Sequence, residues 1–116
     1  MTYGTFWRLL VAMILVLFTL FVIAATAQAR GVPPWWKPGA LCVHRHEGSW
    51  TDSGAPYWGG MQMDWAFMRT HGRSLLARKG TADHWTPREQ LRVAYRGWLV
   101  QGWGAWPRAS RACGLR

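Results

Sequence analysis

The chain has 116 residues and carries 14 Lys and Arg against 5 Asp and Glu, for a formal net charge of +9 at pH 7. This length allows one domain, and the cationic residues are scattered without a basic run or basic helix, which argues against a nucleic-acid partner. Outside a cell, a protein of this charge is expected to gather at anionic wall polymers and membrane head groups.

Residues 1–29 have the pattern of an export signal. Arg8 precedes an apolar run over residues 9–25, and two small-x-small cleavage patterns follow, Ala25-Thr26-Ala27 and Ala27-Gln28-Ala29. The run is slightly short for a membrane-spanning helix and long for a signal, so a retained N-terminal anchor is the alternative. We therefore expect a protein that is secreted to the cell wall, or one that touches the membrane only through this uncleaved segment.

Residues 30–38 are rich in proline and tryptophan. Pro33, Pro34 and Pro38 disfavour a helix and predict a stiff, extended lead-in. The domain proper, residues 39–116, is expected to begin with a short helix that runs from about Gly39 to Glu47. The glycines and the proline of residues 48–62 predict a loop or a short irregular hairpin after it.

Two short helical segments are expected next. Asp64 can cap a helix that begins at Trp65 and ends at Gly72, because its side-chain oxygen can accept a hydrogen bond from the first turn. A further turn or two over residues 74–79 stops at Gly80.

The strongest helix boundary is Thr86-Pro87-Arg88-Glu89, which matches a capping box with proline at the first helical position. The helix that it opens is expected to end at Gly102, and residues 102–107 predict a compact, turn-rich tail leading to Cys113. One apolar stripe of this helix should face the core, with members Leu91, Ala94, Tyr95, Trp98 and Leu99. The sequence therefore predicts a mainly α (α+β) fold of about four short helices with a Gly-rich loop or hairpin.

Two cysteines, Cys42 and Cys113, bracket most of the segment after the expected signal. Export would place them where a disulfide persists, and closing a loop of this length is worth on the order of 4 kcal/mol in the chain-entropy model. We expect no metal and no cofactor, because the possible ligands lack the spacing of known zinc motifs. Those ligands are Cys42, His44, His46, His71 and His84.

Glu47 is the candidate catalytic residue. It would lie in the last turn of its helix, where the negative end of the backbone dipole opposes ionisation, and burial against Trp50 would also favour the neutral acid. A neutral carboxylic acid is what a general acid must be. The alternative is that Glu47 pairs with Arg45 or a nearby histidine on a solvated surface. A glycosidase with two catalytic carboxylates would need a second acid beside Glu47. Asp52 and Asp64 are the candidates, but Asp52 is better explained as a turn former and Asp64 as a helix cap.

Several motifs bear on function. They are Glu47-Gly48-Ser49-Trp50, Tyr57-Trp58-Gly59-Gly60-Met61-Gln62-Met63, Arg88-Glu89-Gln90 with Ala94, and Gly102-Trp103-Gly104-Ala105-Trp106-Pro107. In order and spacing they resemble the catalytic domain of resuscitation-promoting factors and related actinobacterial transglycosylase-like proteins, from about Gly39 to the C-terminus. The family commonly has a cysteine directly before the glutamate and a longer loop to the tryptophan. Here His46 precedes Glu47, and Cys42 lies one helical turn earlier.

The resemblance implies a small lysozyme-like fold that cleaves the bond between N-acetylmuramic acid and N-acetylglucosamine in peptidoglycan, with Glu47 as the sole essential catalytic residue. Gln62 would line the cleft and either bind substrate or orient Glu47, and Gly59 and Gly60 would let the glycan approach the backbone. Trp50, Tyr57 and Trp58 would be sugar platforms, with loop packing as the alternative for Trp50.

Three functions are weighed on this basis. The first is an exported enzyme that acts on peptidoglycan strands, either as a muramidase or as a lytic transglycosylase. The second is a non-catalytic wall-binding or signalling module with the same fold. The third, which the capped helix and the glycine motifs disfavour, is a cationic, tryptophan-rich, membrane-active protein.

Overall fold

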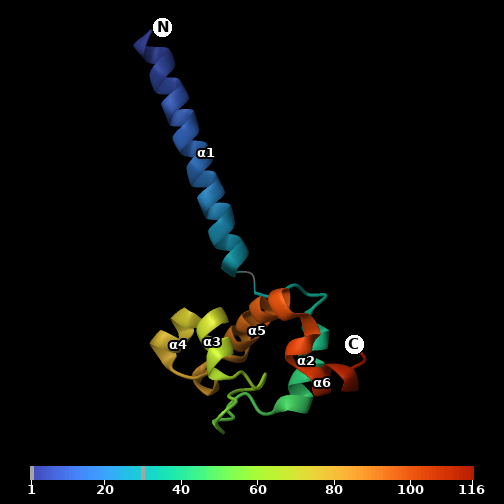
Figure 1. Ribbon diagram of the computed structural model, residues 1–116. Helices are drawn as coiled ribbons and strands as arrows, with labels where there is room; N and C mark the ends of the chain where they lie inside the picture. Colours follow the sequence, from blue (N-terminus) through green and yellow to red (C-terminus); the bar gives the residue numbers. More distant parts are fainter. Residues whose placement is uncertain (1, 30) are drawn as a thin grey trace. The chain divides into compact units, whose positions relative to one another are not determined.

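The computed structural model describes residues 2–29 and 31–116 and divides the chain into two compact units (Figure 1). Helix α1 (Tyr3–Ala29) belongs to the first unit, and the second spans Val32–Arg116. Within α1, Tyr3–Phe21 is long and apolar enough to cross a membrane, a property that signal sequences and membrane anchors share. Residues 1 and 30, the first residues of the expected signal and of the expected lead-in, lie outside the described residues.

The second unit is helical, and the described residues contain no β-strand, which confirms the expectation of a mainly α fold. The hairpin expected in residues 48–62 is reduced to one isolated antiparallel bridge between Trp58 and Met63. In chain order the elements of this unit are α2 (Lys37–Glu47), α3 (Trp65–His71), α4 (Arg73–Lys79), η1 (Ala82–His84), α5 (Pro87–Gln101), η2 (Gly102–Ala105) and α6 (Pro107–Ala112).

The proline-rich segment before α2 is not an extended lead-in, and this expectation is wrong. The carbonyl oxygen of Pro33 accepts hydrogen bonds from the backbone N–H groups of Trp36 and Lys37, so the chain turns there and enters α2 before Gly39. Trp36 is buried, with its ring stacked on that of Trp103 at a centroid distance of 5.7 Å. Its apolar surface therefore draws the segment into the domain core.

Helix α5 begins at the predicted capping box. Thr86 Oγ1 accepts a hydrogen bond from the Glu89 backbone N–H, and Glu89 Oε1 accepts from the Thr86 backbone N–H. Lys79 Nζ donates to the same Glu89 oxygen over 2.8 Å, which joins the end of α4 to the start of α5. This ion pair and the capping hydrogen bonds hold the pKa of Glu89 below its ordinary value.

The buried face of α5 differs from the predicted stripe at one position. Leu91 and Ala94 are buried as expected, but Leu99 is 60% exposed. The core instead continues through Val93 and Gly97, because α3 packs on this side of α5. A Cβ atom at Gly97 would collide with the ring of Phe67, so the close approach of the two helices requires glycine there.

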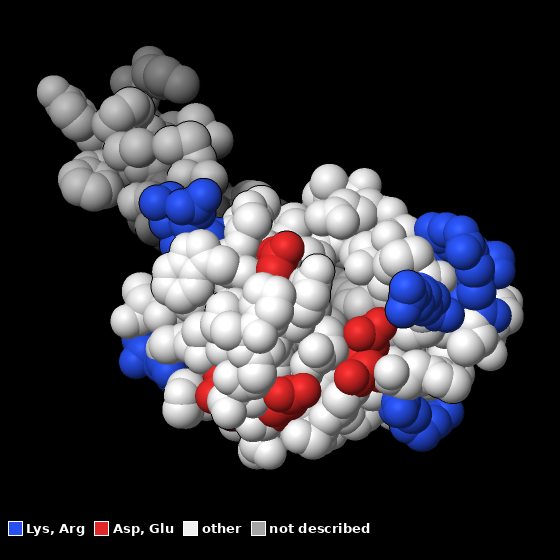
Figure 2. Space-filling model, turned by 60° about the horizontal axis from the view of Figure 1, so that its bottom comes forward, with Lys and Arg blue, Asp and Glu red and all other residues white. Residues whose placement is uncertain are grey.

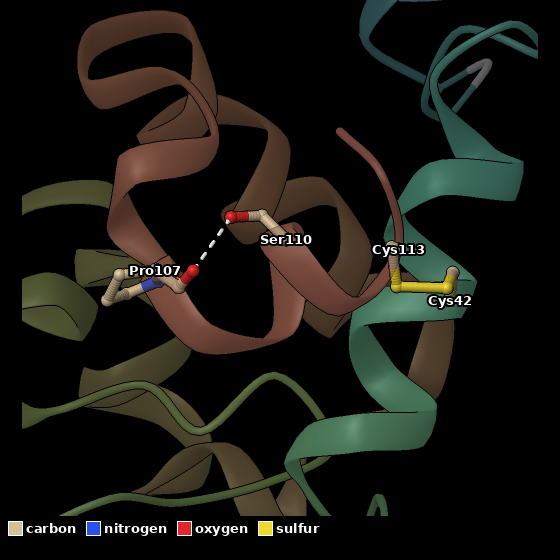
Figure 3. Close-up of a disulfide and its surroundings, with 4 residues drawn as sticks. All are labelled: Cys42, Pro107, Ser110 and Cys113. Carbon is tan, nitrogen blue, oxygen red and sulfur yellow. Dashed lines mark hydrogen bonds between the residues drawn. A yellow bond between two sulfur atoms is a disulfide. The ribbon is translucent and has the colours of Figure 1, made fainter. Parts of the chain in front are cut away.

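The segment after Trp106 forms a short helix, α6, where the sequence predicted only a turn-rich tail. Pro107 occupies its first position, where the missing N–H costs no hydrogen bond. Cys113 follows α6 directly and forms the expected disulfide with Cys42 of α2 (Figure 3). On the buried side of α6, Ser110 Oγ donates to the Pro107 carbonyl oxygen over 3.3 Å. The disulfide thus ties α2 and α6 together.

Candidate active site

Glu47 is the last residue of α2, as predicted. The Gly48 backbone N–H donates to the His44 carbonyl oxygen and ends the helix. A Cβ atom at Gly48 would lie only 3.1 Å from Asp52 Oδ2 and 3.2 Å from Gln62 Nε2, so the loop side chains pack closely beside the end of α2. The Glu47 and Gln62 side chains line the same hollow beyond this helix end.

The environment of Glu47 favours the neutral acid. The residue is half-buried, and burial raises the pKa of its carboxyl group above the ordinary value of 4.5, while the charge of His46 opposes this shift. Neither Arg45 nor a histidine forms an ion pair with Glu47 among the described residues. The surface ion pair weighed above as an alternative is thus absent from the described part of the chain.

Three adjoining hollows form a cleft that passes Glu47. The central hollow, of about 320 Å³, is lined by Glu47, Tyr57, Gln62, Ala105, Trp106, Pro107 and Arg108. The hollow on the α3 side, of about 400 Å³, shares Tyr57, Gln62, Ala105 and Trp106 with it and extends to Thr70, His71 and Gln101. The hollow between α2 and α6, of about 370 Å³, shares Glu47 and Arg108 with the central one and is completed by His46, Ala109 and Ala112. Glu47 therefore lies where two of the hollows meet.

The charges around the cleft are unevenly distributed. Figure 2 shows one face of the molecule, on which Lys and Arg lie toward the sides and the few acidic side chains lie between them. Arg108 lines both hollows that contain Glu47. At the α3 end, burial and the charge of Arg96 lower the pKa of His71, so its imidazole is neutral near pH 7. The α3 end therefore offers the His71 imidazole and the Asp64 carboxyl group, whereas the α6 end offers the Arg108 cation.

Gln62 lines the cleft, and its own hydrogen bonds define what it can offer a ligand. Its backbone has a positive φ of 47°, and Nε2 donates to Asp52 Oδ2 over 2.9 Å and to the Gly59 carbonyl oxygen over 3.0 Å. Both amide hydrogens are thus used within the loop. The amide oxygen remains to accept a hydrogen bond from a hydroxyl or an amide N–H. No hydrogen bond joins Gln62 to Glu47 among the described residues.

The other two candidate carboxylates have the structural roles that the sequence favoured. Asp52 Oδ1 accepts from the Gly54 backbone N–H over 2.9 Å, which forms a turn, while Oδ2 holds Gln62. Asp64 Oδ1 accepts from the Phe67 backbone N–H over 2.7 Å and caps α3. Asp64 also lines the hollow on the α3 side, but neither residue lines the two hollows that contain Glu47.

Gly59 and Gly60 are buried, so the expectation that they face a glycan is wrong. The Gly60 backbone N–H donates to Gln90 Oε1 over 2.8 Å, and a Cβ atom at Gly59 would collide with the same oxygen. A Cβ atom at Gly60 would collide with the ring of Trp50. The two glycines let the loop approach the interior of the domain, not a ligand.

The three aromatic residues proposed as sugar platforms divide into two groups. Trp50 stacks on His44 with ring centroids 3.7 Å apart, and Trp58 is partly buried against the core, so both pack the loop. Neither lines the cleft. Tyr57 is 48% exposed and is the one of these three residues that lines the cleft, in two of its hollows.

Gln90 is the buried residue that organises this loop, and the sequence reasoning missed its role. Its side chain is fully buried, and Nε2 donates to the carbonyl oxygens of Trp50 and Trp85 over 2.8 and 3.0 Å. Its Oε1 accepts from Gly60. The sequence does carry a signal for this role, because Gln90 shares a helical face with Val93 and Gly97. A polar residue on a buried face indicates a hydrogen-bond network.

Two further residues of the cleft were not predicted. Trp106 forms part of its floor, and its Nε1–H donates to the Met61 carbonyl oxygen over 2.7 Å. Arg108 reaches the cleft only because residues 107–112 form α6, which the sequence reasoning missed.

The ligand atoms of His46, Cys42 and Cys113 lie within 4.8 Å of one another, but the disulfide occupies both sulfur atoms. No family model matches this sequence.

Proposed function

We propose that the chain is an exported glycosidase that cleaves the bond between N-acetylmuramic acid and N-acetylglucosamine in peptidoglycan, with Glu47 as its acid. The observation that carries the proposal is that a half-buried carboxyl group of raised pKa lines two adjoining hollows of one cleft. An extended cleft suits a polymer better than a small molecule, and perturbed carboxyl groups in clefts are typical of catalytic acids. The sequence resemblance points to the same reaction.

In this mechanism Glu47 donates its proton to the glycosidic oxygen while the bond from that oxygen to the anomeric carbon breaks. Positive charge develops on the sugar ring, and the acetamido group of the substrate can stabilise it. Glu47, now a carboxylate, then takes a proton from the group that attacks the anomeric carbon. Water as this group completes hydrolysis, whereas the C6 hydroxyl of the same sugar gives an anhydro end.

The arrangement of carboxylates around the cleft favours the anhydro product over hydrolysis. Hydrolases that use two carboxylates place the second one across the scissile bond from the acid. Among the described residues, no second carboxylate lines the hollows that contain Glu47. The amide oxygen of Gln62, in the central hollow, can accept a hydrogen bond from the acetamido N–H or from a sugar hydroxyl. A lytic transglycosylase needs no further acid.

Mass spectrometry of the fragments released from purified peptidoglycan tests the reaction. We expect muropeptides with an anhydro end, each one water lighter than the product of hydrolysis. Glu47→Gln should abolish their release, because glutamine has the shape of the acid but donates no proton to a leaving group. Products with a reducing end would support the muramidase form of the same proposal.

Asp64→Asn is the matched control. It also removes a carboxylate that lines the cleft, but asparagine caps a helix as well as aspartate does, so α3 should persist. We expect this variant to release the same products as the wild type. Absence of products from a folded wild-type chain that still sediments with peptidoglycan would refute the enzyme and favour a non-catalytic wall-binding module.

A further inference from the structure

A partly exposed apolar patch is formed by residues that do not line the cleft. The ring of Trp35 meets that of Trp98 edge to face, with centroids 5.6 Å apart, and Trp98 stacks on Tyr95 at 5.8 Å. Leu99 is one helical turn beyond Tyr95 on the same side of α5. Trp35 is 67% exposed and Leu99 is 60% exposed. We call these four residues the Trp35 patch.

The patch has the chemistry of the interfacial layer of a membrane. Tryptophan and tyrosine rings are enriched at the level of lipid head groups, because they combine an apolar body with a polar tip. Lys37 lies two residues after Trp35 in the chain, and Arg92 lies on the same side of α5 as Leu99, two helical turns earlier. Apolar groups bordered by cations are typical of surfaces that lie on anionic lipid.

The connection to α1 places a bilayer within reach of the patch. Helix α1 has 27 residues, which at 1.5 Å per residue is about 40 Å and exceeds the hydrocarbon core of about 30 Å. From its last residue, Ala29, the chain can extend to Trp35 over about 20 Å at most. A chain that keeps α1 in a bilayer therefore holds Trp35 within about 20 Å of the end of that helix.

We propose that, while α1 is attached, the Trp35 patch rests in the head-group layer of an anionic bilayer. Insertion of the Trp35 ring and of Leu99 removes exposed apolar surface from water, and Lys37 and Arg92 meet lipid phosphates. The contact lies outside the residues that line the cleft, and it does not depend on catalysis. It adds a surface contact to the membrane attachment that α1 alone would provide.

Fluorine NMR of the full-length chain labelled with 5-fluorotryptophan, in anionic nanodiscs, tests this contact. Variants Trp35→Phe and Trp65→Phe each remove one resonance and thereby assign it. Trp65, at the start of α3, is the matched control, because its ring is 52% exposed but does not belong to the patch. A lipid that carries a spin label near its head group then broadens the resonances of nearby rings.

We expect the spin label to remove the Trp35 resonance from the spectrum and to leave the Trp65 resonance visible. The broadening is measured on the wild-type sequence, and the Trp35→Phe variant serves only to assign the resonance. Equal broadening of the two resonances, or a Trp35 resonance that survives the spin label, would overturn the proposal. If a second copy of the chain covered the patch instead of lipid, the Trp35 resonance would survive the spin label.

Discussion

Asp52 holds the side chain of Gln62 through a hydrogen bond of 2.9 Å between Asp52 Oδ2 and Gln62 Nε2. This contact determines which end of the amide remains for a ligand, because it uses a hydrogen on Nε2 and leaves Oε1 as an acceptor. Asp52 does not line the hollows that contain Glu47, so its effect on a substrate would pass through Gln62. Asp52 therefore fixes the orientation of the Gln62 amide.

Asp52→Asn should weaken substrate binding more than the bond-breaking step. The asparagine oxygen can still accept a hydrogen bond from the Gly54 N–H. The asparagine NH2 group would then face the Gln62 NH2 group, and because two donors cannot bond to each other, the Gln62 amide should rotate. We expect KM to rise roughly tenfold, which corresponds to about 1.4 kcal/mol, with a smaller change in kcat. Kinetics on soluble peptidoglycan fragments measures the two constants. A fall in kcat with unchanged KM would contradict this role.

The pH dependence of stability should reveal the burial of Glu47. Its folded pKa is raised, so the folded protein holds this proton more tightly than the unfolded chain, and stability from this group is lost as the pH rises through the folded pKa. Glu47→Gln mimics the neutral acid. The variant should match the Tm of the wild type well below pH 4.5 and exceed it at neutral pH. A wild-type Tm equal to that of the variant at all pH values would exclude the raised pKa.

Removal of the Gln90 side-chain amide should destabilise the whole domain. Gln90→Leu leaves the Gly60 N–H and the carbonyl oxygens of Trp50 and Trp85 without their partner. Each buried group left unsatisfied costs about 1–3 kcal/mol, so we expect a loss of at least roughly 3 kcal/mol in the free energy of unfolding. Urea denaturation measures it. Gln101→Leu, at the exposed end of the same helix, should change stability by less than about 0.5 kcal/mol.

Reduction of the disulfide should lower stability and open one end of the cleft. Cys42 and Cys113 are separated by 71 positions, and a loop of this length is worth about 4 kcal/mol in the chain-entropy model. The paired variant Cys42→Ser with Cys113→Ser should show the same loss as chemical reduction of the wild type. Urea denaturation of both forms provides the comparison. An unchanged midpoint would show that packing alone holds α2 against α6.

Local signals in the sequence were sufficient for most of the helices. The helix boundaries are set by hydrogen bonds between near neighbours in the chain. These are made at the Thr86 capping box, at the Asp64 cap and at the glycines that follow the helices. The position of Glu47 at a helix end followed from the same kind of evidence. Such local contacts are what a single sequence records best.

The errors concern contacts between distant segments. Trp36 enters the core because its ring stacks on that of Trp103, and Gly60 is buried because Gln90 binds its backbone. Leu99 is exposed because α3 packs on the opposite side of α5, at Gly97. Periodicity and residue type do not state which segments meet, so these three assignments required the structure.

The bond between Cys42 and Cys113 also bears on when the cleft acquires its shape. The hollow that joins Glu47 to Arg108 lies between α2 and α6, the two helices that this bond fastens. A thiol pair in a reducing cytoplasm provides no such brace. For an exported chain, this brace across the cleft would therefore form only on the oxidising side of the membrane, after the protein has left the compartment in which it was made.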